Sequence, residues 1–261
     1  MSEFQAQERV TTHFDTAAPV YGSWYTAMNP DGHSFRARRL RCMELLQKHV
    51  QKGSKVADIA CGPATMFKEI LDAGFLVYGT DIAPHMIEEC RKLYGTDSRV
   101  ELAVCSADAI PLPDQSIQAV SAMGLLEYLN NEEQVLHEFH RILTPQGIAI
   151  LTYPHHASPT RIWNRFTHAI AKPFLSILRK GQAPKGVKHR EYHLAQTITQ
   201  VESAGFKVED VVFYNFKLAF RPLDSLFPKL SVRISEKLER FARTPILHRI
   251  GTGFILLARK K

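Results

Sequence analysis

The sequence predicts an α/β fold in which a mostly parallel sheet carries helices on both faces. Short runs rich in Val, Ile and Ala alternate with longer stretches in which apolar residues recur every three or four positions. Glycine and proline separate most of these runs. Strands that alternate with helices pair in parallel, because each helix carries the chain back across the sheet.

Five strands and three helices alternate up to residue 154. Strands are predicted over residues 55–60, 75–81, 100–108, 116–123 and 148–154, and helices over 65–74, 84–94 and 131–143. Gly74 and Gly95 follow two of the helices, as glycine commonly does at a helix end. A helix over 195–205 and strands over 206–215 and 251–261 complete a predicted seven-stranded sheet.

Two insertions, residues 156–190 and 217–250, interrupt the alternation. The first predicts a helix over 161–178 that is kinked at Pro173, with apolar residues on one side and basic residues on the other: Ile162, Trp163, Phe166, Ile170, Phe174, Ile177 and Leu178 against Arg161, Arg165, Lys172 and Arg179. The second repeats this pattern, with Leu223, Leu226, Phe227, Leu230, Ile234 and Phe241 beside Lys229, Arg233, Lys237 and Arg240. Such helices either cap the core as a lid or lie on a membrane surface, and we expect a lid.

The net charge of +7 is distributed unevenly along the chain. Residues 1–154 hold 13 Lys and Arg against 19 Asp and Glu, whereas residues 155–261 hold 20 against 7. The basic C-terminal part suits an anionic substrate, an anionic membrane surface or nucleic acid, unless its cations only increase solubility.

The cysteines and the apolar runs bear on location. Cys42, Cys61, Cys90 and Cys105 are dispersed without C-x-x-C spacing, which favours reduced thiols and a cytoplasmic compartment. No apolar run approaches the roughly 20 residues of a membrane-spanning helix, and residues 1–14 lack the apolar core of a signal peptide. We therefore expect a cytoplasmic protein that could bind the inner face of a membrane peripherally.

Acidic residues lie at the carboxyl ends of the predicted strands, where open parallel sheets bind ligands. Asp58, Asp81 and Asp108 occupy these positions, and the loop after the first strand has one glycine, Gly62. The G-x-G-x-x-G pattern of dinucleotide sites and the glycine–lysine pattern of phosphate loops are both missing. Carboxylates repel phosphate, so these residues suit a ligand that has hydroxyl groups and a positive charge.

Four segments, in the same order and spacing, resemble class I S-adenosylmethionine-dependent methyltransferases. They are "VADIACGPA", "YGTDIAPHMI", "SADAIPLPDQSIQAV" and "HRILTPQGIAILTYP", and "HFDTAAPVYGSWY" is similar to the N-terminal segment that closes over the cofactor. The resemblance covers about residues 10–215 and the last strand. It implies a Rossmann-like fold, S-adenosylmethionine as cofactor and S-adenosylhomocysteine as product, with no metal.

The resemblance also implies roles for individual residues. Asp58 would orient the methionine part of the cofactor, Gly62 would allow its close approach to the backbone, and Ala60 and Ala64 replace family glycines. Asp81 would bind the ribose hydroxyls. The other implied contacts are Ile82 and Met86 against the adenine, Asp108 and Ala109 at its amino group, Tyr21 and Met123 around the cofactor, and Arg36 at its carboxylate.

The same resemblance gives an organisation for residues 1–261 as one methyltransferase domain. Residues 1–50 would form a helical cap, 51–155 the cofactor-binding half, 156–190 and 217–250 the lid, and 191–216 and 251–261 the rest of the sheet. Gln118 and Gln146 depart from the family pattern, which has Asp and Gly at these positions.

The acceptor is less well defined by the sequence. A hydroxyl acceptor would need a base, for which His155 and His189 are candidates, and Tyr192 could orient the acceptor. Glu127 could meet a cationic acceptor or only begin a helix. We expect a small or lipid-like acceptor methylated on O or N. A nucleic-acid methyltransferase is the alternative if the aromatic residues of the insertions are exposed beside a basic groove, and a non-catalytic cofactor-binding partner protein is a third interpretation.

Overall fold

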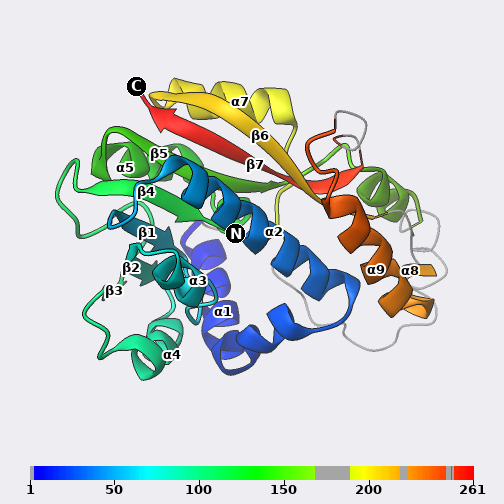
Figure 1. Ribbon diagram of the computed structural model, residues 1–261, viewed down its shortest axis with the longest axis horizontal. Helices are drawn as coiled ribbons and strands as arrows, with labels where there is room; N and C mark the ends of the chain where they lie inside the picture. Colours follow the sequence, from blue (N-terminus) through cyan, green and yellow to red (C-terminus); the bar gives the residue numbers. More distant parts are fainter. Residues whose placement is uncertain (1–2, 168–188, 218–222, 245–247, 249) are drawn as a thin grey trace.

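A seven-stranded sheet forms the centre of the computed structural model, which describes residues 3–167, 189–217, 223–244, 248 and 250–261 (Figure 1). Its strand order is β3-β2-β1-β4-β5-β7-β6. Strands β1 to β5 are parallel, and β7 is antiparallel to both β5 and β6. The strands are β1 (Lys55–Ile59), β2 (Leu76–Asp81), β3 (Val100–Val104), β4 (Ile117–Ala122), β5 (Leu143–Pro154), β6 (Phe206–Phe216) and β7 (Gly251–Lys260). The predicted mostly parallel, seven-stranded sheet is confirmed.

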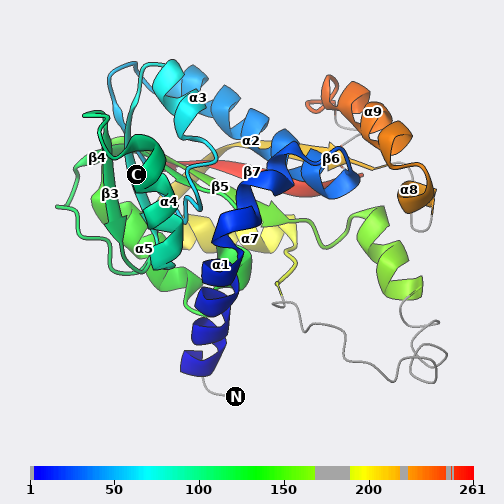
Figure 2. The same ribbon diagram turned by 90° about the horizontal axis from the view of Figure 1, so that it is seen from below.

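Helices cover both faces of this sheet. Figure 2 shows α2 and α3 along one face and α5 and α7 along the other. The described helices are α1 (Glu3–Thr26), α2 (Pro30–His49), α3 (Phe67–Asp72), α4 (Pro84–Tyr94), the 3₁₀ turn η1 (Leu126–Tyr128), α5 (Glu132–Ile142), α7 (Leu194–Ser203), α8 (Leu223–Leu226) and α9 (Pro228–Glu239), with a further helix over residues 159–167. None of the described helices is long and apolar enough to cross a membrane.

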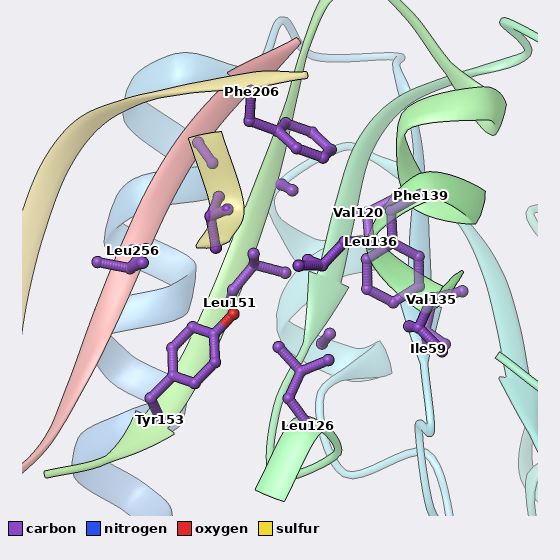
Figure 3. Close-up of a cluster of buried hydrophobic side chains, with 14 of the residues drawn as sticks. Ile59, Val120, Leu126, Val135, Leu136, Phe139, Leu151, Tyr153, Phe206 and Leu256 are labelled. Carbon is purple, nitrogen blue, oxygen red and sulfur yellow. The ribbon is translucent and has the colours of Figure 1, made fainter. Parts of the chain in front are cut away.

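Each face of the sheet has its own apolar core. The core in Figure 3 joins the inner side of α5, including Leu136 and Phe139, to β4 and β5. The opposite core packs Leu46 of α2 and Phe67 of α3 on the other face of the sheet. Because each fully buried side chain of this kind contributes about 1.5–3 kcal/mol, these two cores hold the strand ends in fixed positions.

The third strand is shorter than predicted. It ends at Val104, which pairs with Asp81, the last residue of its only neighbour, β2. Without a neighbour to bond with beyond this point, the chain turns away after Cys105 donates its amide to the Asp81 carbonyl (3.1 Å). Asp108 therefore lies in a loop, and not at a strand end as predicted.

The apolar residues of the first insertion lie on the surface, whereas we expected the insertions to form a lid over the core. In the helix over residues 159–167, Ile162, Trp163 and Phe166 are exposed, whereas Arg161 and Arg165 pair with Glu191. The rest of the first predicted helix lies outside the described residues.

In α8 and α9 the predicted apolar stripe also lies outward. Leu226, Phe227 and Leu230 are 57–65% exposed, while the buried side of α9 is formed by Ser231, Val232, Ser235 and Glu239. The described aromatic residues of the insertions, whose helical spacing is typical of burial against a core, are therefore exposed.

A turn early in β5 offers a test of backbone strain. Gln146 is exposed and has a left-handed φ of 64°, where the family pattern has glycine. A left-handed backbone costs a residue with a side chain about 1–2 kcal/mol, and glycine avoids this cost. Glycine also increases the conformational entropy of the unfolded chain, which cancels part of the gain in stability. Gln146→Gly should therefore raise the free energy of unfolding by about 0.5–1 kcal/mol in denaturant titrations. Gln51→Gly is the matched control, because Gln51 has no positive φ and should gain nothing. An equal effect of the two changes would contradict the strain at Gln146.

Candidate functional site

The strand order reverses between β1 and β4, which opens a crevice at the carboxyl ends of these strands. Asp58 lies near the end of β1 and Asp81 ends β2 beside it. The loop from Ala60 to Met66 leaves β1 and enters α3. Backbone amides and two carboxylates are thus brought to one edge of the sheet.

Alternate residues of this loop have a left-handed backbone. The φ angles of Ala60, Gly62 and Ala64 are 56°, 55° and 59°. These are the three positions at which the sequence resemblance places glycines. A left-handed alanine is unfavourable, so the loop keeps its shape only because its surroundings fix it.

Asp81 is one of the groups that fix the loop. Its Oδ2 accepts a hydrogen bond from the Gly62 amide (3.0 Å), and its Oδ1 accepts one from the Ala83 amide (2.9 Å). Burial raises the pKa of Asp81, and these amide hydrogen bonds oppose the shift. The carboxylate joins the loop after β1 to the end of β2.

Two thiols hold the same loop from behind. Cys90 Sγ of α4 donates to the Gly62 carbonyl (3.1 Å), and Cys61 Sγ lies 3.4 Å from that oxygen. Nothing in the sequence signals this contact, since Cys90 is far along the chain and no spacing pattern joins it to Cys61.

Asp58 is a buried carboxyl with a perturbed acidity. It is 2% exposed, and this burial raises its pKa to about 7, with the charge of Asp81 adding to the shift and the Ser121 hydroxyl opposing it. A buried carboxyl of this kind is costly to ionise unless a cation or hydrogen-bond donors approach it. The site is therefore suited to a ligand that is positively charged.

A small cavity lies over the loop. It has a volume of about 10 Å³ and is lined by Tyr21, Tyr25, Asp58, Ala60, Cys61, Gly62, Thr65 and Met123. This volume is far below the roughly 300–1,000 Å³ of typical ligand pockets. The ring of Tyr21 covers the loop, since a Cβ on Gly62 would lie 3.5 Å from it. A cofactor-sized ligand would thus require Tyr21 to move outward.

Helix α1, which carries Tyr21, also covers the end of β2. Ala18 packs against Ala83 and Met86, with Phe14 beside them. Asp15 accepts the His85 amide (3.0 Å) and lies 2.5 Å from His85 Nδ1. The helix forms a cover that is held against α4 by a small buried apolar cluster and by the exposed pair of Asp15 and His85.

A second set of buried polar groups lies beyond β4. Arg38 of α2 lies against Gly124, where a Cβ would come within 2.6 Å of its guanidinium. Glu127 in η1 is 7% exposed, and its burial raises its pKa while the charge of Arg38 opposes the shift. Arg38 Nε and Glu127 Oε2 are both buried without a hydrogen-bond partner among the described residues. Such orphaned atoms at a strand end are expected where a ligand supplies the missing partner.

Comparison with known proteins agrees with this geometry. A family model described as methyltransferase domain matches residues 57–151. This match identifies residues 57–151 as a methyltransferase domain, in agreement with the resemblance to class I S-adenosylmethionine-dependent methyltransferases. A protein of Mycolicibacterium smegmatis named as a probable S-adenosylmethionine-dependent methyltransferase is 28% identical over 174 residues, which is 66% of this chain and 60% of the relative.

Two further proteins are similar to this methyltransferase domain, one in sequence and one in fold. The ubiquinone/menaquinone biosynthesis C-methyltransferase of Campylobacter jejuni is 25% identical over 158 residues, covering 56% of this chain and 64% of the relative. The chain thus spans about three fifths of the length of these curated relatives. The 1,6-didemethyltoxoflavin-N1-methyltransferase of Burkholderia thailandensis, solved with S-adenosylhomocysteine, has a similar fold (TM-score 0.64, 13% identity, 100% of this chain and 91% of that one).

The residues present fit the methyltransferase cofactor. S-adenosylmethionine carries a sulfonium and an ammonium charge, which would offset the cost of ionising the buried Asp58 carboxyl. Its ribose has two hydroxyls that could donate to Asp81 oxygens. Among the described residues, no group of three or more His, Cys, Asp or Glu could hold a metal ion.

The structure brings most of the implied cofactor residues of the methyltransferase together, but not all. Tyr21, Asp58, Ala60, Gly62 and Met123 line the cavity, and Asp81, Ile82 and Met86 follow at the end of β2. Asp108 accepts a hydrogen bond from Asn131 and is partly exposed, with Ala109 exposed beside it.

Arg36 lies apart from this cavity. Its guanidinium donates to the carbonyls of Tyr25 (3.1 Å) and Ala27 (2.7 Å). Arg38, two residues on, points toward the site instead. No sequence signal singles out Arg38, because the buried positions of α2 include both Arg38 and Arg41.

The three candidates for acid–base chemistry do not line the cavity. Tyr192 lies with its hydroxyl 2.8 Å from the Leu126 carbonyl and 2.9 Å from Glu132 Oε2. His155 donates from Nδ1 to the Gly251 carbonyl (3.1 Å), and burial lowers its pKa. His189 is exposed beside Tyr128. The sequence-based candidates thus have structural partners of their own. Glu127 lies in η1, a few residues after the end of β4.

The Asp58 carboxyl should make the protein without ligand less stable as the pH rises from about 4 to about 7. In this window the folded state keeps a proton that the unfolded state has already lost, so the unfolding free energy decreases as pH increases. Asp58→Asn cannot titrate and should flatten this decrease in denaturant titrations at a series of pH values. Asp97→Asn is the control, because Asp97 is partly exposed and its pKa of about 2 lies below the window. A pH slope unchanged by Asp58→Asn would contradict the buried, protonated carboxyl.

Proposed function

We propose that the chain transfers a methyl group from S-adenosylmethionine to an O or N atom of a small or lipid-like acceptor, which it meets at a membrane surface. The observation that carries the proposal is the left-handed loop of residues 60–64 next to the buried carboxyls of Asp58 and Asp81. The N1-methyltransferase that shares the fold acts on a small molecule, in agreement with this acceptor class. The four free cysteines support a reducing compartment, and we place the enzyme in the cytoplasm.

The protein's part in the reaction would be mostly positional. Bound S-adenosylmethionine supplies an electrophilic methyl group on a positively charged sulfur. Asp58, Asp81 and the loop amides would hold the cofactor, and α1 would exclude water by closing over it. Alignment of this kind can contribute about 7–11 kcal/mol to lowering a barrier. We assign residues 1–50 to the cap and residues 51–155 to the cofactor-binding half of one catalytic domain.

Glu127 and Arg38 are suited to the acceptor. A hydroxyl acceptor could pass its proton to Glu127 Oε2 while Arg38 Nε donates to the acceptor oxygen, which satisfies both orphaned atoms. An amine acceptor would instead meet Glu127 as a cation and lose a proton to it before reaction. Either role makes Glu127 the group that handles the acceptor proton.

The relatives raise a third acceptor atom. The Campylobacter jejuni relative is named as a C-methyltransferase, an option that the sequence-based expectation of O or N did not include. A ring hydroxyl that loses its proton increases the nucleophilicity of both its oxygen and the neighbouring ring carbons. A hydroxylated ring is therefore compatible with Glu127 whether oxygen or carbon receives the methyl group.

Calorimetric titration with S-adenosylmethionine and S-adenosylhomocysteine tests the cofactor site. The wild type should bind both, and Asp81→Ala should weaken binding about tenfold to a hundredfold, because charge-assisted hydrogen bonds are lost. Asp97→Ala, a loop carboxylate outside the site, should bind as the wild type does. Thermal unfolding of each variant would separate lost contacts from a misfolded loop. Absence of binding by a folded wild type would overturn the proposed function and leave a non-catalytic role.

A further inference from the structure

The exposed residues of α8 and α9 form two neighbouring rows. Leu226, Phe227, Leu230 and Phe241 make up the apolar row, and each is 57–65% exposed. Lys229, Arg233, Lys237 and Arg240 make up the basic row, and all four are exposed. On a helix of 3.6 residues per turn the basic row of α9 lies directly beside Leu230 and Phe241.

Buried charges fix this orientation of α9. Glu239 is 6% exposed; its Oε2 accepts a hydrogen bond from Arg41 Nη2 of α2 (3.1 Å) and its Oε1 accepts one from the Asn215 amide of β6 (2.6 Å). Ser231 and Ser235 complete the inner side of the helix. Rotating the apolar row inward would strip Arg41 and Glu239 of their partners, which is strongly unfavourable. The outward apolar row is thus a fixed feature of the fold.

A second apolar group lies at the same end of the molecule. The helix of residues 159–167 exposes Ile162, Trp163 and Phe166, and both views place it at the same end as α8 and α9 (Figures 1 and 2). Every strongly exposed Trp or Phe among the described residues belongs to this helix or to the apolar row. Exposed apolar groups collected in one region mark an interaction surface.

We propose that the apolar row and the basic row dock the protein on a membrane that contains anionic phospholipids. Apolar side chains would enter the boundary between headgroups and acyl chains, while the neighbouring cations meet lipid phosphates. None of the four cations is paired with a carboxylate within the described part of the chain. The proposal deepens the proposed function by naming where a lipid-like acceptor is met, but docking does not depend on methyl transfer.

The charge pattern favours a membrane over two other occupants. A second copy bound through the same rows would bring two sets of four cations together. Single-stranded nucleic acid binds in basic grooves lined by aromatic platforms. Here the apolar row contains leucines, which do not stack on bases as aromatic rings do. The groove among α2, α3 and α9, which Arg240 of the basic row also lines, holds four glutamates and four arginines, so its formal charges balance and it is not a basic groove.

Vesicle flotation tests the docking surface directly. The full chain should float with vesicles of phosphatidylcholine mixed with phosphatidylglycerol, and less with pure phosphatidylcholine. Phe227→Ser/Leu230→Ser and Arg233→Glu/Lys237→Glu should each lower the partition coefficient by about tenfold or more. Arg91→Glu/Leu93→Ser is the matched control, because both residues are exposed on α4 at the other end of the molecule.

The outcomes separate docking from catalysis. Unchanged thermal unfolding and S-adenosylmethionine titration would show that the variants are folded. A wild type that does not float with anionic vesicles, or row variants that float as well as the wild type, would overturn the proposal. Two results, each combined with no vesicle binding by the wild type, would assign the surface to another occupant. If the wild type is a dimer in light scattering and the row variants are not, the occupant is a second copy of the chain. If the wild type binds single-stranded RNA and the row variants do not, the occupant is nucleic acid. If the protein does not bind S-adenosylmethionine, the proposed methyltransferase function fails. The proposed docking surface would still be tested by vesicle binding alone.

Discussion

The ligand-binding edge of this methyltransferase depends on one buried carboxylate that joins two parallel strands. Asp81 ends β2 and accepts the amide of Gly62 in the loop that follows β1. Without this bond the loop would keep the backbone hydrogen bond from the Cys61 amide to the Thr80 carbonyl of β2 (2.9 Å), but the left-handed residues around Gly62 would have less to hold them. Because the proposed function assigns the ribose hydroxyls of the cofactor to this carboxylate, one residue would both shape the site and bind the ligand.

Two alanines make the cradle a strained form of a glycine-rich loop. Ala60 and Ala64 hold φ angles that glycine adopts freely, and each lies next to a fixed element, β1 or the turn before α3. A hydrogen bond from the Gly62 amide to Asp81 and one from the Cys90 thiol to the Gly62 carbonyl hold the middle of the loop. A strained backbone persists where its surroundings over-determine it, which is common at functional sites.

Charge networks, and not apolar packing, orient the C-terminal helix. In most amphipathic helices the apolar stripe turns toward the core. In α9 the buried pairing of Arg41 with Glu239 sets the rotation, and small serines allow α9 to approach its neighbours. The apolar row therefore faces outward and is free to contact another surface. The cost of burying these charges is balanced only when both partners are present, so α2 and α9 depend on each other.

The sequence by itself determined the sheet, most of its helices and the edge at which the ligand binds. These follow from local periodicity, turn residues and the positions of acids at strand ends, which are short-range properties of the chain. Only the tertiary structure decided which arginine of "GHSFRARRLR" faces the site, because that depends on how α2 is rotated against the sheet. It also decided that the stripe of α9 faces outward. A helical period shows that an apolar stripe exists, but the side that is buried was set by Glu239 meeting Arg41, a residue 198 positions away in the sequence.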